Sequence, residues 1–143
     1  MKTESNNIIF LYAEFTPYLK GCLDYFVHSN KSYNITVICF NIFKSLNKSS
    51  HINYNLILKD NFKNKYELKK YCESINPSLI IMSGTMSKDY IYTSKKLSKE
   101  CNIVSVQDTM ISNSIKQFIQ VGLYKFYFRT FIKFFWGVGT SQT

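Results

Sequence analysis

The sequence predicts an α/β domain in which a mostly parallel sheet lies between layers of helices. Short, unbroken apolar runs recur along the chain, segments with helical spacing separate them, and polar or turn-forming residues close each run. Apolar runs without alternation are typical of strands buried on both faces. Strands that alternate with helices favour parallel pairing and right-handed crossovers. A length of 143 residues fits one domain, so we expect a single unit over residues 1–143.

The clearest strand is predicted at 79–83, between Pro77 and Gly84. Its apolar core has no polar interruption, which indicates a central position in the sheet. Ser83 and Gly84 then fall at the carboxyl end of this strand, where open α/β sheets bind their ligands. The other apolar runs predict strands at 8–13, 35–40, 54–58, 103–106 and 136–140.

Helices are predicted between these strands from caps and apolar spacing. Thr16 followed by Pro17 marks the start of the first helix. Asn64 resembles the cap of a second helix, with Glu67 in capping-box position. A third helical pattern follows Gly84. The last helix is expected from residues 112 or 113 to about Phe135.

The net charge of +9 favours anionic partners such as nucleic acid, phosphorylated substrates or a membrane surface. Of the 18 basic residues, all but Arg129 are lysines. Because arginine supplies the bidentate contacts used to read bases and phosphates, this composition argues against a dedicated nucleic-acid reader. A basic nucleic-acid-binding module stays open as an alternative function, but we expect no nucleic-acid partner.

The four cysteines lie far apart, and no spacing typical of a metal site appears. We therefore expect no metal and four free thiols in a reducing compartment, with Cys22 and Cys72 on apolar helix faces. The first residues lack the apolar core of a signal peptide. No run of about 18 apolar residues is present. These features predict a cytoplasmic protein.

Candidate site residues gather where the predicted strands end. Glu14 closes the first strand, Ser83 and Gly84 close the central one, and Gln107 with Asp108 close the next. Parallel strands place these ends along one edge of the sheet. Predicted helix starts near Pro17, Lys88 and Asn113 direct partial positive charge to the same edge. Each carboxylate has an alternative role as a helix cap or loop anchor.

Three stretches of the chain carry a resemblance to a known family: 9–18 (IFLYAEFTPY), 83–90 (SGTMSKDY), and 107–109 with 114–116 (QDT and SIK). In this order they resemble the amino-terminal half of GT-B-fold glycosyltransferases, and most of all the retaining, family-4-like enzymes of bacterial surface polysaccharide synthesis. The resemblance implies a Rossmann-like domain that binds a saccharide or lipid-linked acceptor. It implies that the donor, a nucleotide diphosphate sugar, is bound mostly by a second domain, and that this domain itself binds no cofactor.

The resemblance implies roles for particular residues. Asp108 and Glu14 become the candidates for contact with the reacting acceptor hydroxyl. The expected substrate-binding residues are Tyr18, Ser83, Gly84, Lys88, Asp89, Tyr90 and Gln107.

This sequence departs from the family pattern in two respects. Residues 1–143 do not include the donor-binding domain, so we expect this chain to be inactive without that domain or a partner chain that supplies it. Phe15-Thr16-Pro17 replaces the glycine-rich turn that many members carry after the first strand. A non-catalytic α/β binding or membrane-anchoring subunit is the alternative from another functional class.

Residues 115–135 also predict contact with an anionic membrane surface. On one continuous helix, Lys125, Arg129 and Lys133 form a narrow basic stripe, and aromatic residues including Phe128 and Phe131 cover most of the rest. Such a helix carries more apolar surface than packing on a sheet requires. We expect a peripheral location on the inner face of the plasma membrane. Coverage of the same surface by the donor-binding domain is the alternative.

Overall fold

One parallel sheet organises the computed structural model, which describes residues 6–46, 53–84, 87–107, 122 and 126–137. Within these residues the sheet has six strands in the order β3-β2-β1-β4-β5-β6, all paired in parallel. The prediction of an α/β fold with a parallel sheet is confirmed, and the fold is Rossmann-like. The strands are β1 (Asn7–Phe15), β2 (Asn34–Ile42), β3 (Asn55–Leu58), β4 (Leu79–Ser83), β5 (Asn102–Gln107) and β6 (Phe134–Gly137).

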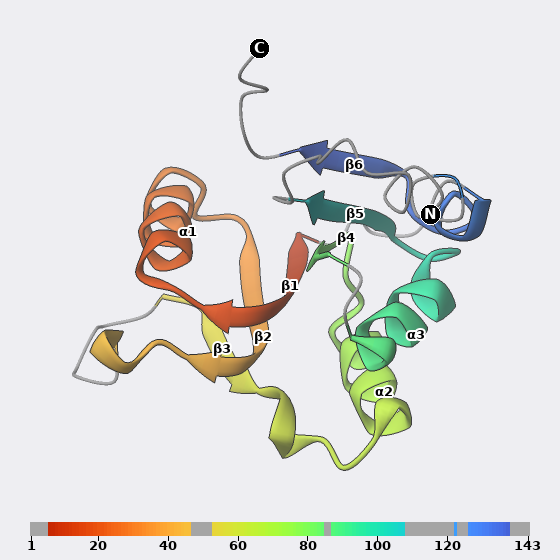
Figure 1. Cartoon of the computed structure of the whole chain (residues 1–143). Helices are drawn as coiled ribbons and strands as arrows, with labels where there is room; N and C mark the ends of the chain where they lie inside the picture. The colour runs from red at the N-terminus through yellow and green to blue at the C-terminus, as the bar shows by residue number, and fades with distance from the viewer. Residues whose placement is uncertain (1–5, 47–52, 85–86, 108–121, 123–125, 138–143) are drawn as a thin grey trace.

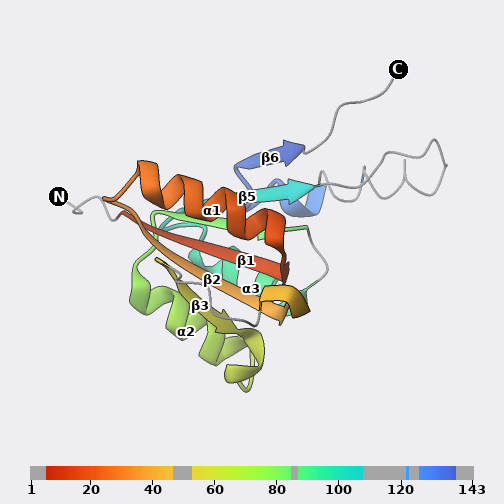
Figure 2. The same cartoon turned by 90° about the vertical axis from the view of Figure 1, so that its left-hand side faces the viewer.

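Helices cover both faces of the sheet and give the domain three layers. Helix α1 (Pro17–Ser29) lies on one side, and α2 (Lys65–Ile75) and α3 (Lys88–Leu97) lie on the other (Figures 1 and 2). Two short 3₁₀ turns, η1 (Lys44–Leu46) and η2 (Lys59–Asn61), follow β2 and β3. This arrangement is what right-handed crossovers produce when the strand order runs outward in both directions from β1.

Each face of the sheet has its own hydrophobic core. Leu11 and Ile80 have no exposed surface and pack with Leu68 of α2 and Leu97 of α3. On the other face, Val37 packs with the α1 residues Leu19 and Leu23. Full burial of one such side chain stabilises the fold by about 1.5–3 kcal/mol. Burial on both faces explains why these strands have apolar runs rather than alternating sequences.

The three helices described begin where their sequence signals predict. Thr16 Oγ1 accepts a hydrogen bond from Leu19 N at 3.2 Å, and Pro17 is the first residue of α1. Asn64 Oδ1 accepts bonds from the backbone amides of residues 66 and 67 at the start of α2. Ser87 caps α3 in the same manner, with 3.3 Å between its Oγ and Tyr90 N.

The prediction of one helix reaching Phe135 is wrong at its carboxyl end. Residues 126–128 are helical, but the chain turns at 129–131 and enters β6 at Phe134. Ile132 N donates to Phe128 O at 2.8 Å in the last turn, and Lys133 N donates to Ile103 O at 3.0 Å as pairing with β5 begins. Edge pairing with β5 therefore prevails over helical spacing, because aromatic residues at nearly every position suit a strand as well as a helix.

The predicted basic stripe does not form, because Arg129 lies in the turn and Lys133 precedes the strand. Phe128 and Phe131 are only 6% and 4% exposed and belong to the core shared with α2 and α3, so the prediction that they contact a membrane is wrong. Lys125 lies outside the described residues. Among the described helices, none is long and apolar enough to cross a bilayer.

The four thiols differ in accessibility, and this generates a prediction. Cys22 is exposed, contrary to the expectation of an apolar position, whereas the other three are buried. Burial raises the pKa of the Cys39 and Cys101 thiols to about 11 and that of Cys72 to about 12. We expect a thiol reagent at pH 8 to label Cys22 rapidly and the other three only after denaturation.

The same thiols predict a loss of stability in alkali. A raised folded-state pKa stabilises the fold below the unfolded thiol pKa of about 8.5, and this contribution is lost as pH rises towards the folded values. Urea titrations at increasing pH measure this loss, and Cys72→Ala provides the comparison variant.

In the labelling experiment, rapid reaction of all four cysteines in the native state would contradict the buried core described for this domain.

Candidate functional site

Pairing between β1 and β4 stops before the carboxyl end of β1, and we call this end of the two strands the opening between β1 and β4. The two strands pair only as far as Leu11 opposite Met82. Beyond this point β1 continues beside β2 until Phe15 lies opposite Ile42. Strand order reverses at this same junction, since the chain builds the sheet outward from β1 in one direction and from β4 in the other. Ligands of doubly wound α/β proteins bind at such a junction.

Ser83 and Gly84 line this opening on the β4 side. Ser83 Oγ accepts a hydrogen bond from Ala13 N of β1 at 3.1 Å, where a ladder bond between main chains would otherwise form. Gly84 N donates to Val106 O at 2.9 Å, so β4 stays with β5 as it leaves β1. The φ of +64° at Gly84 lies in a region that other residues adopt only with strain. Because Ser83 Oγ accepts the bond from β1, its hydroxyl proton can be donated to a ligand.

Glu14 provides the charged group on the β1 side. It is exposed, lies opposite Asn41 of β2, and forms no ion pair within the described part of the chain. Phe15 beside it is 1% exposed and anchors the strand end in the core beneath α1. Asn41 was not among the predicted site residues, although it follows the apolar run of β2 in the same way that Glu14 and Ser83 follow theirs.

The first turn of α1 offers few free amides to this opening. Pro17 has no N–H, Leu19 N is bonded to the Thr16 hydroxyl, and Lys20 N donates to Thr16 O at 2.9 Å. Tyr18 lies on this turn and is 76% exposed. A hydrogen bond with the Cys22 thiol raises the Tyr18 pKa above its usual value. The turn therefore differs from the glycine-rich turns that hold phosphates with several backbone amides.

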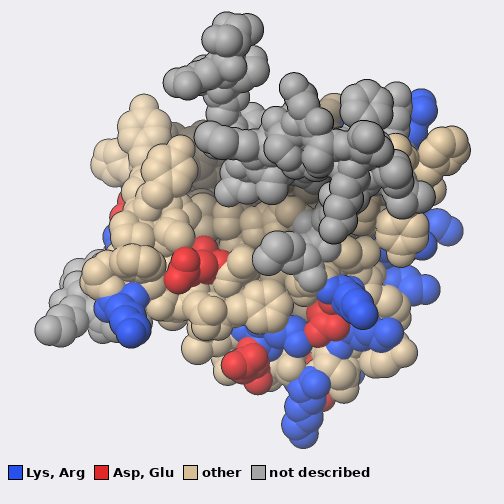
Figure 3. Space-filling view, viewed as in Figure 1, with Lys and Arg blue, Asp and Glu red and all other residues tan. Residues whose placement is uncertain are grey.

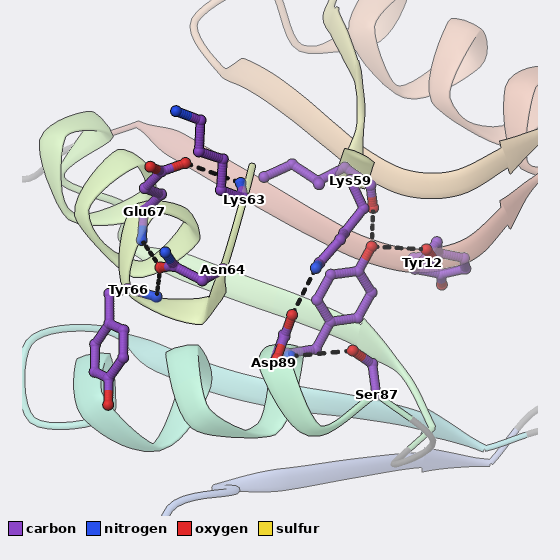
Figure 4. Close-up of polar contacts among 10 residues, drawn as sticks. Tyr12, Lys59, Lys63, Asn64, Tyr66, Glu67, Ser87 and Asp89 are labelled. Atoms are coloured by element: carbon purple, nitrogen blue, oxygen red, sulfur yellow. Dashed lines mark hydrogen bonds and ion pairs between the residues drawn. The ribbon is translucent and has the colours of Figure 1, made fainter. Parts of the chain in front are cut away.

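The start of α3 follows the carboxyl end of β4 in the chain, and Figure 4 shows the polar contacts of its first residues. Lys88 is the first residue of the helix and is exposed. Asp89 points towards Lys59 of η2, and their charged atoms are 2.6 Å apart. This ion pair joins the end of β3 to α3, and a carboxylate in the first turn also suits the helix dipole. Asp89 is thus engaged within the domain, and sequence spacing gave no sign of Lys59 as its partner.

Tyr90 is a structural residue, so its prediction as a substrate contact is wrong. Its side chain is 3% exposed and packs against Phe40, with 5.2 Å between ring centroids. The hydroxyl lies 3.2 Å from Tyr12 O and 3.1 Å from Ile38 O, and can donate to either. Burial raises the pKa of Tyr90 far above its usual value, so the hydroxyl remains a donor at any physiological pH. It ties α3 to β1 and β2 beneath the opening.

Two of the predicted site residues, Gln107 and Asp108, lie partly or wholly outside the described residues. The backbone of Gln107 ends β5 opposite Gly137 of β6, while its side chain lies outside the described set. Asp108, the preferred catalytic candidate, lies outside the described residues as well. Ser83, Gly84, Glu14 and the start of α3 do gather at the carboxyl edge, as predicted. No group of three or more metal-binding side chains occurs among the residues the structure describes.

Comparisons with protein-family models, curated proteins and solved structures find no match to this chain.

The two carbonyl contacts of Tyr90 generate the second prediction. Tyr90→Phe should lower the free energy of unfolding by about 1–3 kcal/mol, because it removes a buried hydrogen bond from the Tyr90 hydroxyl to the main chain of β1 and β2. Tyr92→Phe, on the partly exposed side of the same helix, should change it by less than about 0.5 kcal/mol. Urea denaturation measures both. Equal stability of the Tyr90 variant and the parent chain would show that this hydroxyl does not hold α3 to the sheet.

Proposed function

We propose that this chain is the acceptor-binding half of a sugar-nucleotide-dependent glycosyltransferase of surface polysaccharide or glycolipid synthesis. The observation that carries the proposal is the opening between β1 and β4, which presents separate hydrogen-bonding groups rather than an array of free amides. Glu14 offers acceptor atoms, Ser83 offers a hydroxyl proton, and the side-chain amide of Asn41, opposite Glu14 on the neighbouring strand β2, offers both.

A saccharide suits this set of groups. Each sugar hydroxyl both donates and accepts, so it can donate to the Glu14 carboxylate and accept from Ser83 in the same opening. A pyrophosphate needs several backbone N–H groups or a cationic fork, and the Thr16-Pro17 turn leaves few such amides free. This contrast supports an acceptor site here and donor binding elsewhere, as the family resemblance implies.

The remaining parts of the proposal follow from the same assignment. A donor-binding domain or partner chain supplies the nucleotide diphosphate sugar, and this half binds no cofactor of its own. Asp108, which follows β5 in the sequence, contacts the reacting hydroxyl together with Glu14. A lipid-linked acceptor places the enzyme in the cytoplasm at the inner membrane surface. A non-catalytic binding subunit would share the opening but would give no turnover once the donor-binding part is added.

Glu14 and Ser83 provide the third prediction. Glu14→Gln and Ser83→Ala should each weaken binding of soluble hexose or N-acetylhexosamine oligosaccharides about tenfold, because each removes a hydrogen bond worth about 1.4 kcal/mol. Ligand-observed NMR measures binding to the isolated chain. In an enzyme completed by its donor-binding part, Asp108→Asn should lower kcat/KM at least about tenfold.

Glu73→Gln serves as the control, since it removes a carboxylate from α2 that is paired with Lys69 outside the opening. Saccharide affinity should be unchanged in that variant, and circular dichroism checks that all variants fold. Unaltered saccharide binding after both the Glu14 and Ser83 changes would refute the acceptor site.

A further inference from the structure

The helical layer made by α2, α3 and the 126–133 segment carries most of the excess positive charge of the chain. Residues 63–75, 88–100 and 126–133 contain ten of the 18 basic residues and four of the nine acidic ones, a net charge of +6 out of +9. On the face seen in Figure 3, basic side chains gather over α2 and α3. We call the outer surface of these three segments the α2–α3 face.

Tyrosine rings and lysine ammonium groups alternate across the α2–α3 face. Lys65 Nζ lies 4.7 Å from the centroid of the Tyr92 ring and 5.2 Å from that of Tyr66, which joins α2 to α3. Lys95 Nζ lies 5.2 Å from the Tyr127 ring centroid, which joins α3 to the last segment. Cation–π contacts reach to about 6 Å, so these pairs link α2 to α3 and α3 to the last segment across the face.

Carboxylates neutralise only a small part of the positive charge on this face. Within the described residues the ion pairs are Lys20–Asp24, Lys59–Asp89 and Lys69–Glu73. Eight of the ten basic residues of the face are exposed and belong to none of these pairs: Lys63, Lys70, Lys88, Lys95, Lys96, Lys99, Arg129 and Lys133.

Large exposed aromatic side chains lie among these charges. Phe126 is 87% exposed, Tyr66 is 61% exposed and Tyr127 is 53% exposed. Tyr127 also stacks edge-on against buried Phe128, with centroids 5.1 Å apart, so it is held in place from below. Amphipathic rings beside cations are typical of protein surfaces at a membrane–water interface, where the ring enters the headgroup layer and the ammonium meets anionic lipid.

A nucleic acid fits this surface less well. Single-stranded chains need free aromatic faces for base stacking, but Lys65 and Lys96 both lie within cation–π distance of the Tyr92 ring and Tyr66 contacts it edge-on. Phosphate and base readout favours arginine, of which the face has only Arg129. An anionic bilayer needs neither free aromatic faces for stacking nor arginine side chains, since it attracts lysines as point charges.

We propose that the α2–α3 face docks on the surface of an anionic lipid bilayer. Contact is made by Lys95, Lys96 and their basic neighbours, with Phe126 and Tyr66 entering the interface. The docking surface lies outside the opening between β1 and β4, and it does not depend on glycosyl transfer.

Cosedimentation with lipid vesicles tests the proposal on the full 143-residue chain. The protein should bind vesicles of phosphatidylcholine mixed with phosphatidylglycerol, should not bind phosphatidylcholine alone, and should be released at high salt. Lys95→Gln with Lys96→Gln should weaken binding about thirtyfold, at about fivefold for each lysine lost near an anionic surface. Phe126→Ser should weaken it further.

Matched controls lie on other parts of the domain. Lys31→Gln with Lys44→Gln removes the same charge, and Tyr25→Ser removes a ring that is 77% exposed on α1. Neither control should change vesicle binding by more than about twofold. No binding to anionic vesicles at low salt, or equal loss in control and test pairs, overturns the proposal. Binding of DNA or RNA that the Lys95 and Lys96 changes abolish, without vesicle binding, overturns it in favour of nucleic acid.

Discussion

The separation of β4 from β1 is the constraint on which the rest of this structure depends. Strand β1 is paired on both sides up to Leu11, and beyond that residue it follows β2 while β4 follows β5. The strand order reverses at this point, so the helices that follow β1 and β4 lie on opposite faces of the sheet and leave the two strand ends accessible. Ser83 spans the first step of the gap through its bond to Ala13 N.

Structural and ligand-binding roles are divided between the two sides of the sheet edge. Beneath the opening, Tyr90 bonds to main-chain carbonyls of β1 and β2, and the Lys59–Asp89 pair fixes the start of α3. These contacts engage the polar groups of Tyr90, Lys59 and Asp89 within the domain. Glu14 and Ser83 keep groups that a ligand can use, which is why the proposed site rests on the β1 and β4 ends and not on α3.

Local sequence signals predicted most of the fold because they reflect local physics. The Thr16-Pro17 cap, the Asn64 cap and the apolar runs each depend on hydrogen bonds or burial within a few residues. The helix predicted for the segment before β6 was wrong at its carboxyl end for the opposite reason. Phe134 and its neighbours suit a helix or a strand equally, and the choice was made by pairing with Ile103 and Val104, which are about 30 residues away.

The predictions of site residues were correct or wrong for the same physical reasons. The strand-end rule correctly brought Glu14, Ser83 and Gly84 together, because parallel order alone fixes where strand ends lie. It could not tell a ligand contact from an internal one. Tyr90 and Asp89 follow a strand end in sequence, yet their partners come from β1, β2 and η2. Such partners are set by tertiary packing that no short motif records, and the same holds for the lysine and tyrosine contacts between α2 and α3.

Backbone amide NMR of the isotope-labelled chain, titrated with soluble oligosaccharides, tests the central claim most directly. If the opening between β1 and β4 is the ligand site, the largest shift changes will fall on Ala13 to Phe15, on Asn41, and on Ser83 with Gly84. Shift changes centred on the outer surface of α2 and α3, or spread evenly without saturation, would contradict the account.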